Sequence, residues 1–596
     1  MRLLHRLENL LLAATLAALL VFGVASVYPA WAVADELIRH LTLLAGMVGG
    51  MVAARDGQLL AMGAVVQALP RRLRAGAALV TGLVATAIAA LLALAAWQFV
   101  REEAATGSTL AFGIPRIALQ AALPAGFAVI TLRLAWRSAE GTGLRLLVLV
   151  AAVTGAVVAE RLGADLAMLR VPLLLLLALA TALGAPIFTV LAGVALIWFL
   201  TAGDPIASVP LDHYDQVTNP LLATLPLFTL AGYVVAATGA ARRLVRLLRA
   251  WTGHLRGGPA VVTVLACAFF TAFTGGSGVT ILALGGLLMP ILLSSGYREQ
   301  TALGLVTGAG SLGVLFAPCL PLILYSIVAQ VPMTTMFLGA ALPGLLLVLL
   351  AAAWGVLASP PVEQRRRRFS LRRALVATWR AKWELLLPVL PLTLIFGGFA
   401  LPVPAAALTA AFALFAAAAL NRDLPRAAGL LEVVRECGAL VGGILLILGA
   451  AMGLTNLLIT AHVPDRLTEW IGATLDSRWL FLLALNLFLL AVGCLMDIFS
   501  AIIVIAPLVV PVGLAFGMDP VHLGVILLAN LELGYLTPPV GLNLFMSAAR
   551  FGRPVLKVAR ASLPMLAVLA AGLVAITALP ELTLALPRWF AAAGLE

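Results

Sequence analysis

The chain has 596 residues, of which 63% are hydrophobic and 11% are charged, and its formal net charge is +12 at pH 7. A soluble protein of this length could not bury so much apolar surface, since about half apolar is typical of soluble domains. Apolar runs of about 18 residues or more, each long enough to cross a bilayer, recur roughly 15 to 17 times, some of them interrupted. The composition therefore predicts an all-α, polytopic membrane protein.

The positive charge comes mainly from arginines between apolar segments, with the largest cluster at 365–382. Basic loops beside membrane spans face the cytoplasm, so the lipid bilayer is the expected partner and nucleic acid is not. The four cysteines lie in or beside apolar segments without metal-ligand spacing, and we expect them to be small packing residues. They are Cys267, Cys319, Cys437 and Cys494.

Residues 1–137 predict four membrane helices. The first ends near Val27, the second runs from about Glu36 to Ala54, the third ends at Val100 and the fourth near Arg137. The first apolar run is longer than that of a signal peptide, and another hydrophobic segment follows at once, so we expect an uncleaved helix. Basic and acidic loops alternate, which places both ends of this block in the cytoplasm.

Residues 138–165 predict a linker and a connecting helix, with the apolar run at Leu144–Val158. A longer block, 166–596, has more Gly and Pro inside its apolar runs. The basic segment Arg242–Arg256 favours the cytoplasm, whereas strict alternation of spans places it outside. We therefore expect one segment of this region to lie in the membrane interface.

The long block repeats itself at an offset of 221 residues. Five matches fall within 37 positions, which indicates two copies of one unit with a basic stretch near 360–383 between them. The matched pairs are Pro290 and Pro511, Gly296 and Gly517, Gly313 and Gly534, Pro318 and Pro539, and Ser326 and Ser547.

The second copy contains LELGYLTPPVGLNLF at 531–545. A Pro pair removes backbone donors and breaks a helix, and freed backbone groups in hydrocarbon cost several kcal/mol each unless something satisfies them. Matching breaks in two halves indicate a transporter site, where freed carbonyls suit Na⁺ and half-helix N-termini suit a carboxylate. Three alternatives remain open: a simple kink at a single proline, a place near a membrane face for Glu532, and a helix-bridging role for Asn543.

No enzyme chemistry is predicted. Residues 308–313 fit GxGxxG, but they lie inside the apolar repeat without a preceding strand, so a dinucleotide site is excluded. The sequence has no GxxxxGK[ST] motif, which argues against an ATP-driven pump.

Several stretches resemble the tripartite ATP-independent periplasmic (TRAP) transporters, in the form with fused small and large membrane subunits. The small-subunit resemblance, at 34–58 and 113–127, is looser. The large-subunit stretches include TGGSGVTILALGGLLMPILLSSGY (274–297), APCLPLILYS (317–326) and GMDPVHLGVILLANLELGYLTPPVGLNLF (517–545).

The resemblance implies Na⁺-driven import of small organic carboxylates, such as a C4-dicarboxylate, sialic acid or a related acid, across a bacterial inner membrane. A periplasmic substrate-binding protein would supply the substrate, and Na⁺ would be the coupling ion with no other cofactor. A four-helix small-subunit block, 1–137, would join an elevator-type large subunit with two inverted repeats, each with a re-entrant hairpin and a broken helix. The alternatives are a stand-alone ion-coupled carboxylate carrier, which has no need of the N-terminal block, and a non-transporting scaffold.

The resemblance also implies two Na⁺ sites. The first would use Gly276, Ser277 and Thr280 with the break at Gly313 and Pro318. The second would use Gly534, Thr537, Pro538 and Gly541. The polar residues expected near the substrate are Asp497, Asn543, Cys319 and Glu532. Two departures stand out: the family's Pro-Pro-Ser is Ala317-Pro318-Cys319 here, which loses a hydroxyl, and a common Thr-Glu is Val403-Pro404.

Overall fold

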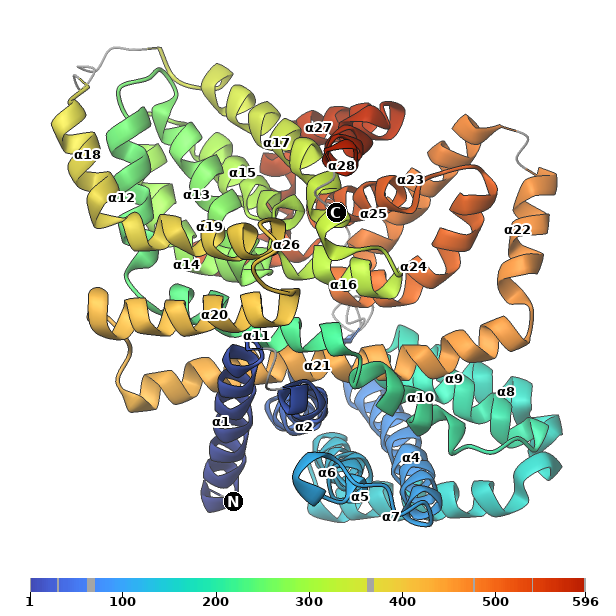
Figure 1. The fold of residues 1–596 in the computed structure, drawn as a ribbon. Coiled ribbons are helices and arrows are strands. Elements are labelled where there is room, and N and C mark those ends of the chain that lie inside the picture. The colour runs from blue at the N-terminus through green and yellow to red at the C-terminus, as the bar shows by residue number, and fades with distance from the viewer. Residues whose placement is uncertain are drawn as a thin grey trace. The chain divides into compact units, whose positions relative to one another are not determined.

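The computed structural model describes residues 2–28, 32–61, 70–361, 369–474, 477–538 and 540–593, and nearly every element in these ranges is a helix (Figure 1). Thirteen helices of the described residues are long and apolar enough to span a membrane, or up to 14 if the bent pair Glu299–Leu315 and Leu320–Val328 is one span. Three further apolar helices are shorter, at Ile187–Ala202, Gly258–Thr274 and Pro520–Gly534. The number of spans expected from the sequence, roughly 15 to 17, is higher because it includes such short and broken segments. The prediction of an all-α polytopic membrane protein is confirmed.

The chain forms two compact units. The first comprises Met1–Pro226 with Leu431–Arg466, and the second Leu227–Leu430 with Leu467–Glu596. The first unit thus contains the predicted small-subunit block and connecting helix together with two parts of the predicted large-subunit region. The domain boundaries at 137 and 165 stay a prediction. The repeat boundary near 360–383 and Pro539 lie partly or wholly outside the described residues.

The first unit contains the four helices expected within residues 1–137, the last of them divided into a short and a longer piece. The helices are α1 (Arg2–Ala25), α2 (Ala32–Asp56), α4 (Arg71–Ala104), α5 (Arg116–Gln120), α6 (Ala122–Arg137), α7 (Thr142–Leu162), α8 (Arg170–Ala182), α9 (Ile187–Ala202), α10 (Ser208–Val217) and most of α21 (Ala427–Thr460).

Small residues let α2 and α21 approach closely. A Cβ atom on Gly49 would lie 2.1 Å from the carbonyl oxygen of Gly438, and one on Gly442 would lie 2.1 Å from the carbonyl carbon of Gly49. Such contacts are typical of helix pairs in membranes, where close van der Waals packing replaces the hydrophobic effect as the force that joins helices. The N-terminal block is therefore packed against a helix of the large-subunit region.

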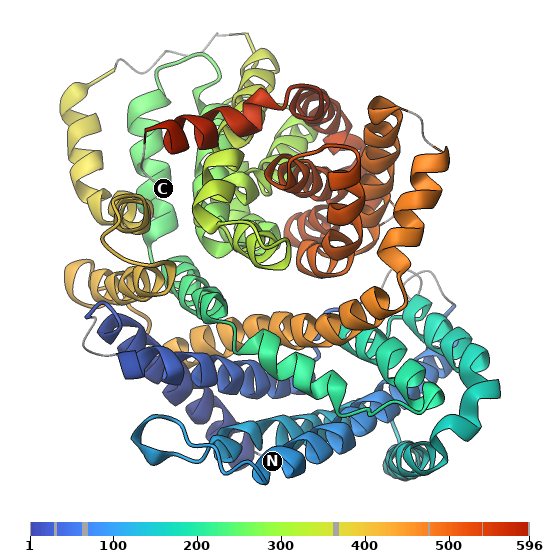
Figure 2. The ribbon, with the colours of Figure 1, turned by 45° about the vertical axis from the view of Figure 1, so that its right-hand side comes forward.

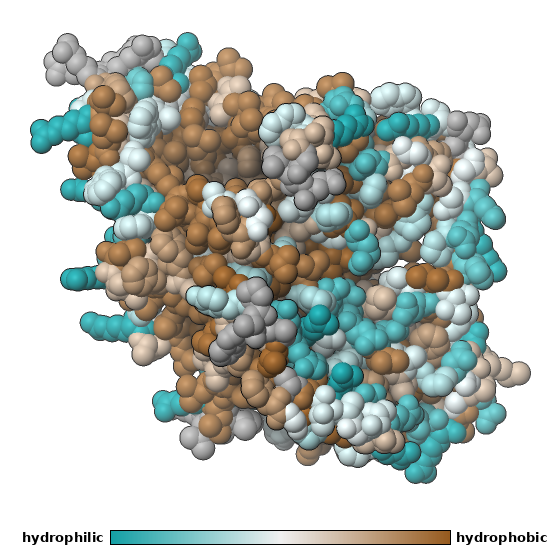
Figure 3. All heavy atoms as spheres, in the orientation of Figure 1, coloured by the Kyte–Doolittle hydropathy of each residue, from teal (hydrophilic) through white to brown (hydrophobic). Residues whose placement is uncertain are grey.

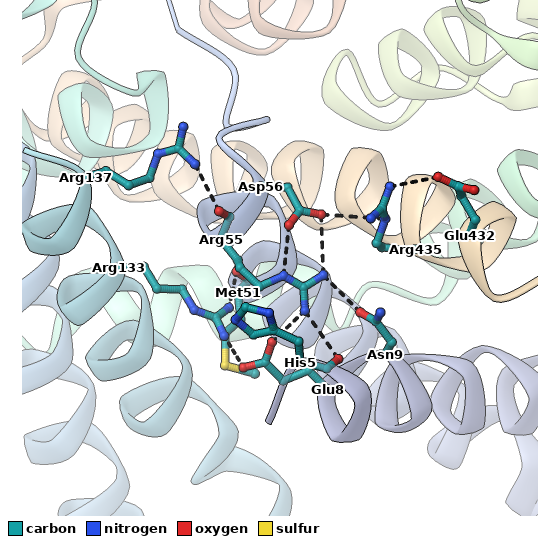
Figure 4. Close-up of polar contacts among 10 residues, drawn as sticks. All are labelled: His5, Glu8, Asn9, Met51, Arg55, Asp56, Arg133, Arg137, Glu432 and Arg435. Carbon is teal, nitrogen blue, oxygen red and sulfur yellow. Dashed lines mark hydrogen bonds and ion pairs between the residues drawn. The ribbon is translucent and has the colours of Figure 1, made fainter. Parts of the chain in front are cut away.

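A cluster of charged side chains joins α1, α2, α6 and α21 at one end of these helices (Figure 4). Arg55 donates from Nη1 to Glu8 Oε2 at 2.9 Å and from Nε to Asp56 Oδ1 at 2.9 Å. Arg133 donates to the other oxygen of Glu8, and Arg435 of α21 lies 3.7 Å from Asp56. Because Arg55 and Glu8 are only 10% and 13% exposed, removal of either partner would leave a poorly solvated charge.

The second unit contains two series of helices with the same spacing. Ser277 and Ile498, which begin α14 and α24, are 221 positions apart, as are Leu357 and Ala578, which end α17 and α27. This is the offset of the sequence repeat, although the inverted relation of the copies stays a prediction. The first series is α13 (Gly258–Thr274), α14 (Ser277–Ser294), α15 (Glu299–Ala309), η5 (Leu312–Leu315), α16 (Leu320–Val328) and α17 (Met333–Leu357); the second is α23 (Arg478–Leu495), α24 (Ile498–Ala515), α25 (Pro520–Gly534), α26 (Leu542–Phe551) and α27 (Val555–Ala578).

The other helices of the second unit flank these two series. They include most of α11 (Thr224–Ala237) and of α22 (Val463–Thr474), together with α12 (Ala240–Thr252), α18 (Leu371–Arg380), α19 (Lys382–Phe396) and α20 (Pro402–Phe415). The C-terminal α28 (Glu581–Ala592) packs against α17 (Figure 2). Apolar side chains cover much of the face in view in Figure 3. On α23, for example, Leu483 and Leu487 are exposed one turn apart, as expected of a helix that faces lipid.

Candidate ion and substrate site

The first hairpin consists of α13 and α14, which pack against each other and are joined by Gly275 and Gly276. Gly275 has a φ of +66°, and a Cβ atom there would lie 2.7 Å from the side chain of Leu320. Both the backbone conformation and the lack of space therefore require glycine at this position. The consequence is a hairpin tip that lies directly against the first residue of α16.

Hydroxyl groups join this tip to the first helix break. Thr271 Oγ1 lies 2.6 Å from Thr280 Oγ1 and donates to the carbonyl oxygen of Gly310 at 2.6 Å. Thr274 Oγ1 is 3.4 Å from Thr280 Oγ1. Three threonines thus gather beside a carbonyl at the end of α15, and only Thr280 was predicted. The available signal was TAFTGG, in which two threonines one helical turn apart precede the glycine pair.

Ser277 is the predicted ligand with the most unusual surroundings. It begins α14, is 3% exposed, and its hydroxyl oxygen has no hydrogen-bond partner in the described part of the chain. A buried polar group without a partner costs about 1–3 kcal/mol. A hydroxyl in this condition is well suited to a ligand that is not part of the chain, such as a cation.

The first break separates α15 from α16, and the segment Glu299–Leu315 meets α16 at a bend of 44°. Between them, Gly313 lies so close to α13 that a Cβ atom would be 2.2 Å from the carbonyl oxygen of Ala268. Pro318 and Cys319 are buried, and the Cys319 thiol is 3.8 Å from the carbonyl oxygen of Thr271. Glycine at 313 is thus explained by packing, and the thiol lies close to a backbone carbonyl of α13.

The second hairpin consists of α23 and α24, and its tip meets the second break, which separates α25 from α26. The backbone N–H of Gly541 donates to the carbonyl oxygen of Cys494 at 3.2 Å, and a Cβ atom on Gly534 would be 2.4 Å from the carbonyl carbon of Gly493. Thr537 donates its hydroxyl to Leu533 O of its own helix at 3.1 Å. The structure therefore brings Gly534 and Gly541 to the tip.

Pro538 and Asp497 have more ordinary surroundings. Pro538 is exposed. The Asp497 carboxylate caps α24: its oxygens accept from the backbone N–H groups of Phe499 and Ser500, both at 3.0 Å, and from the Ser500 hydroxyl at 2.5 Å. An Asp that satisfies the first N–H groups of a helix has a structural role, and its role near a substrate stays a prediction.

Glu532 and Asn543 belong to the second broken helix but reach the first. Glu532 is fully buried close to Ser311, and neither carboxylate oxygen has a hydrogen-bond partner among the described residues. Asn543 Nδ2 donates to the carbonyl oxygen of Thr307 in α15 at 3.3 Å, while its buried Oδ1 lacks a partner in the same part of the chain. Asn543 thus bridges helices, which was the alternative open from the sequence, and it keeps one free acceptor.

Comparison with known proteins gives two family matches that together cover most of the chain. Residues 173–582 match the family described as "Tripartite ATP-independent periplasmic transporter, DctM component", and residues 18–142 match the DctQ component of the same transporters. The order of the two matches is that of a fused small and large subunit.

Individual relatives agree. The chain is 35% identical over 396 residues to the C4-dicarboxylate TRAP transporter large permease protein DctM of Pseudomonas aeruginosa; the alignment covers 66% of this chain and 92% of that protein. It is 32% identical over 423 residues to the isethionate TRAP transporter permease protein DctMQ of Oleidesulfovibrio alaskensis; the alignment covers 70% of this chain and 65% of that protein. It is 28% identical over 386 residues to the sialic acid TRAP transporter large permease protein SiaM of Vibrio cholerae; the alignment covers 63% of this chain and 88% of that protein.

These relatives are permeases, and the DctM match alone spans more than half of the chain. With thirteen helices of membrane-spanning length in the described residues, they confirm the predicted family, the expectation of a transporter in place of an enzyme, and the inner-membrane location. The chain belongs to the TRAP transporter family as a fused DctQ–DctM permease, a multi-pass protein of the bacterial inner membrane that takes up substrate.

Proposed function

We propose that the chain imports a small organic acid together with Na⁺, by an elevator movement, and receives the acid from a periplasmic substrate-binding protein. The observation that carries the proposal is the meeting of a hairpin tip with a helix break in each half of the second unit. At both places glycines bring backbone segments to within the reach of one small ligand, and broken helices in matching positions are typical of secondary-transporter sites.

Neutral oxygens suit Na⁺ as the coupling ion. The first tip supplies the hydroxyls of Ser277, Thr280 and two neighbouring threonines, one of them hydrogen-bonded to a carbonyl at the end of α15. Hard cations bind oxygen ligands, including backbone carbonyls freed at a helix break. Two Na⁺ ions entering would gain roughly 4.6 kcal/mol per 100 mV of membrane potential, partly offset by an anionic substrate that moves with them.

The substrate class follows from the relatives. Those above are named for a C4-dicarboxylate, isethionate and sialic acid, each of which carries an anionic group. The Cys319 thiol and the N-termini of α16 and α26 are the groups offered to that anion, because helix N-termini favour negative charge. The N-terminal block favours a binding-protein-dependent permease over a stand-alone carrier.

The test is uptake into proteoliposomes. Labelled succinate, isethionate and sialic acid are offered with and without a cognate binding protein, under an inward Na⁺ gradient or with choline in place of Na⁺. We expect uptake of one class that needs both the binding protein and Na⁺. Uptake that needs Na⁺ but not the binding protein would support the stand-alone carrier, and uptake indifferent to Na⁺ would refute the coupling.

A further inference from the structure

A cavity of about 380 Å³ in the second unit lies between α12 and α18, and none of the residues predicted for the ion sites lines it. Its walls are mainly arginine side chains with two small apolar residues. The lining residues are Arg243, Arg246, Arg372, Arg373, Arg380, Val376 and Ala377.

The cavity has an excess of positive charge. Arg243 is paired with Glu384 at 2.5 Å and with Asp423 at 2.6 Å, and Arg246 donates to the carbonyl oxygen of Arg242. Among the described residues, the three arginines from α18 form no ion pair. Five guanidinium groups thus share two carboxylates, and the like charges around one space repel unless an anion lies between them.

The helices that carry the arginines are held in place by apolar contacts. Leu244 and Leu247 of α12 form a buried cluster with Ala381, at the end of α18. On the outside, Trp251 Nε1 donates to the hydroxyl of Thr378 at 2.9 Å. The two helices that carry the arginines are therefore held against each other before any anion binds, which lowers the entropy cost of binding.

The same helices have the features of segments that lie at a membrane surface. With 10 and 13 residues, α18 and α12 are too short to span a bilayer. On α18, Leu371, Leu375 and Trp379 are exposed, Trp379 by 70%, and Lys382 Nζ lies 3.4 Å from the centre of the Trp379 ring. Hydrophilic side chains project along the left edge of Figure 3, where Figure 1 places α18. Exposed apolar and aromatic residues beside arginines are typical of interfacial helices.

We propose that this cavity binds the phosphate-bearing head group of an anionic membrane lipid. Guanidinium groups match phosphate oxygens in charge and in hydrogen-bond geometry, and basic clusters on amphipathic helices are typical lipid head-group sites. The exposed Leu371, Leu375 and Trp379 provide an apolar surface for acyl chains beside the charged cavity. A free phosphate ion would use the arginines alone, so the apolar surface favours a lipid.

The proposal is tested on the delipidated full chain in a neutral detergent. Phosphatidylglycerol, phosphatidylcholine and soluble glycerol phosphate are titrated separately, and binding is followed by native mass spectrometry and by the shift in Tm. We expect phosphatidylglycerol to bind at least about tenfold more tightly than phosphatidylcholine, since each basic residue near an anionic surface contributes about fivefold in affinity. Glycerol phosphate is expected to bind far more weakly; equal stabilisation by glycerol phosphate would overturn the lipid assignment in favour of a soluble anion.

The key variant replaces the three α18 arginines with glutamine: Arg372→Gln, Arg373→Gln and Arg380→Gln. It is expected to lose the preference for phosphatidylglycerol, whereas the matching lysine triple keeps most of it because the charge remains. If the glutamine triple does not fold, the single Arg380→Gln variant is expected to show about a fivefold loss.

A matched control removes three exposed arginines that lie outside the cavity, by Arg101→Gln, Arg161→Gln and Arg466→Gln. It has the same net charge as the α18 triple and is expected to retain the lipid preference. Retention of the preference by the α18 triple, or its equal loss in the control, would show that the cavity is not the site.

Discussion

Replacing Ser277 with alanine separates the loss of a ligand oxygen from the loss of a hydrogen bond. In the structure the Ser277 hydroxyl is buried and has no partner among the described residues. Without Na⁺, its removal therefore breaks no hydrogen bond and relieves the cost of a desolvated polar group. We expect the Na⁺-free variant to be unchanged or more stable by up to about 1 kcal/mol.

With Na⁺ present the effect reverses. A ligand at 100 times its Kd stabilises the folded state by about 2.7 kcal/mol. If the loss of one ligand oxygen weakens Na⁺ binding about tenfold, the same concentration is only about 10 times the Kd, and the stabilisation falls to about 1.4 kcal/mol. The measurement is the free energy of unfolding from SDS titrations followed by tryptophan fluorescence, with choline replacing Na⁺ at constant ionic strength.

The matched control is Ser562→Ala. Ser562 is also fully buried, but it donates its hydroxyl to the carbonyl oxygen of Val558 at 3.0 Å. The control is expected to lose about 0.5–1.5 kcal/mol with or without Na⁺ and to keep the full Na⁺ response. The reasoning fails if Ser277→Ala is destabilised by more than about 1 kcal/mol without Na⁺, or if its Na⁺ response equals that of the wild type.

Three further changes test the contacts described above. Gly534→Ala would put a methyl group 2.4 Å from the carbonyl carbon of Gly493. We expect the free energy of unfolding in SDS titrations to fall by about 1–3 kcal/mol and uptake to be lost. The control Gly443→Ala, where a Cβ atom has no atom within 4 Å, should retain both stability and uptake. Asp497→Ala should cost about 0.5–2 kcal/mol and Asp497→Asn less, because Asn also caps helices; equal losses would contradict the capping role. Glu8→Ala removes the carboxylate that Arg133 and Arg55 share and leaves Arg55 with Asp56 alone. It should cost about 3 kcal/mol in the same titration, and a loss below about 1 kcal/mol would show that water reaches the cluster.

The membrane helices were predictable because hydrocarbon leaves the backbone few alternatives. A long apolar run in a bilayer must satisfy its own N–H and C=O groups, and a helix does so within one segment. The second helix was expected from about Glu36 to Ala54 and runs from Ala32 to Asp56. The bounds differ by a few residues because polar residues at helix ends are tolerated near the interface, where hydropathy does not distinguish them from a loop.

The contacts of the candidate site were less predictable, because they join residues far apart in the sequence. The hydrogen bond from Thr271 to Gly310 spans 39 positions, and the one from Asn543 to Thr307 spans 236. Glu532 was expected near the substrate and lies next to the second break in sequence, whereas its side chain is close to Ser311 at the first break. The sequence of a helix predicts which of its faces is apolar, but the helix that packs against each face cannot be read from one sequence.

The internal repeat explains which residues of the candidate site could be predicted from the sequence. Gly313 and Gly534 match at the offset of 221, and both lie where a Cβ atom would strike the backbone of a hairpin, so the match reflects a steric demand common to both halves. The predicted ligands do not match: the counterparts of Ser277 and Thr280 are Ile498 and Ala501. The two ion sites would therefore differ in their side-chain oxygens and depend on carbonyls to different extents.

The position of Glu532 gives one more consequence of the repeat. Its counterpart at the offset of 221 is Ser311, and these two residues lie beside each other in the interior. When two units are related by a two-fold axis, a residue close to the axis contacts its own counterpart. The contact is therefore what an inverted pair of repeats predicts, with its axis passing near this serine and glutamate. Neither oxygen of this buried carboxylate has a hydrogen-bond partner in the described part of the chain. If the repeats are inverted about this point, a charge on Glu532 would act on both broken helices at once.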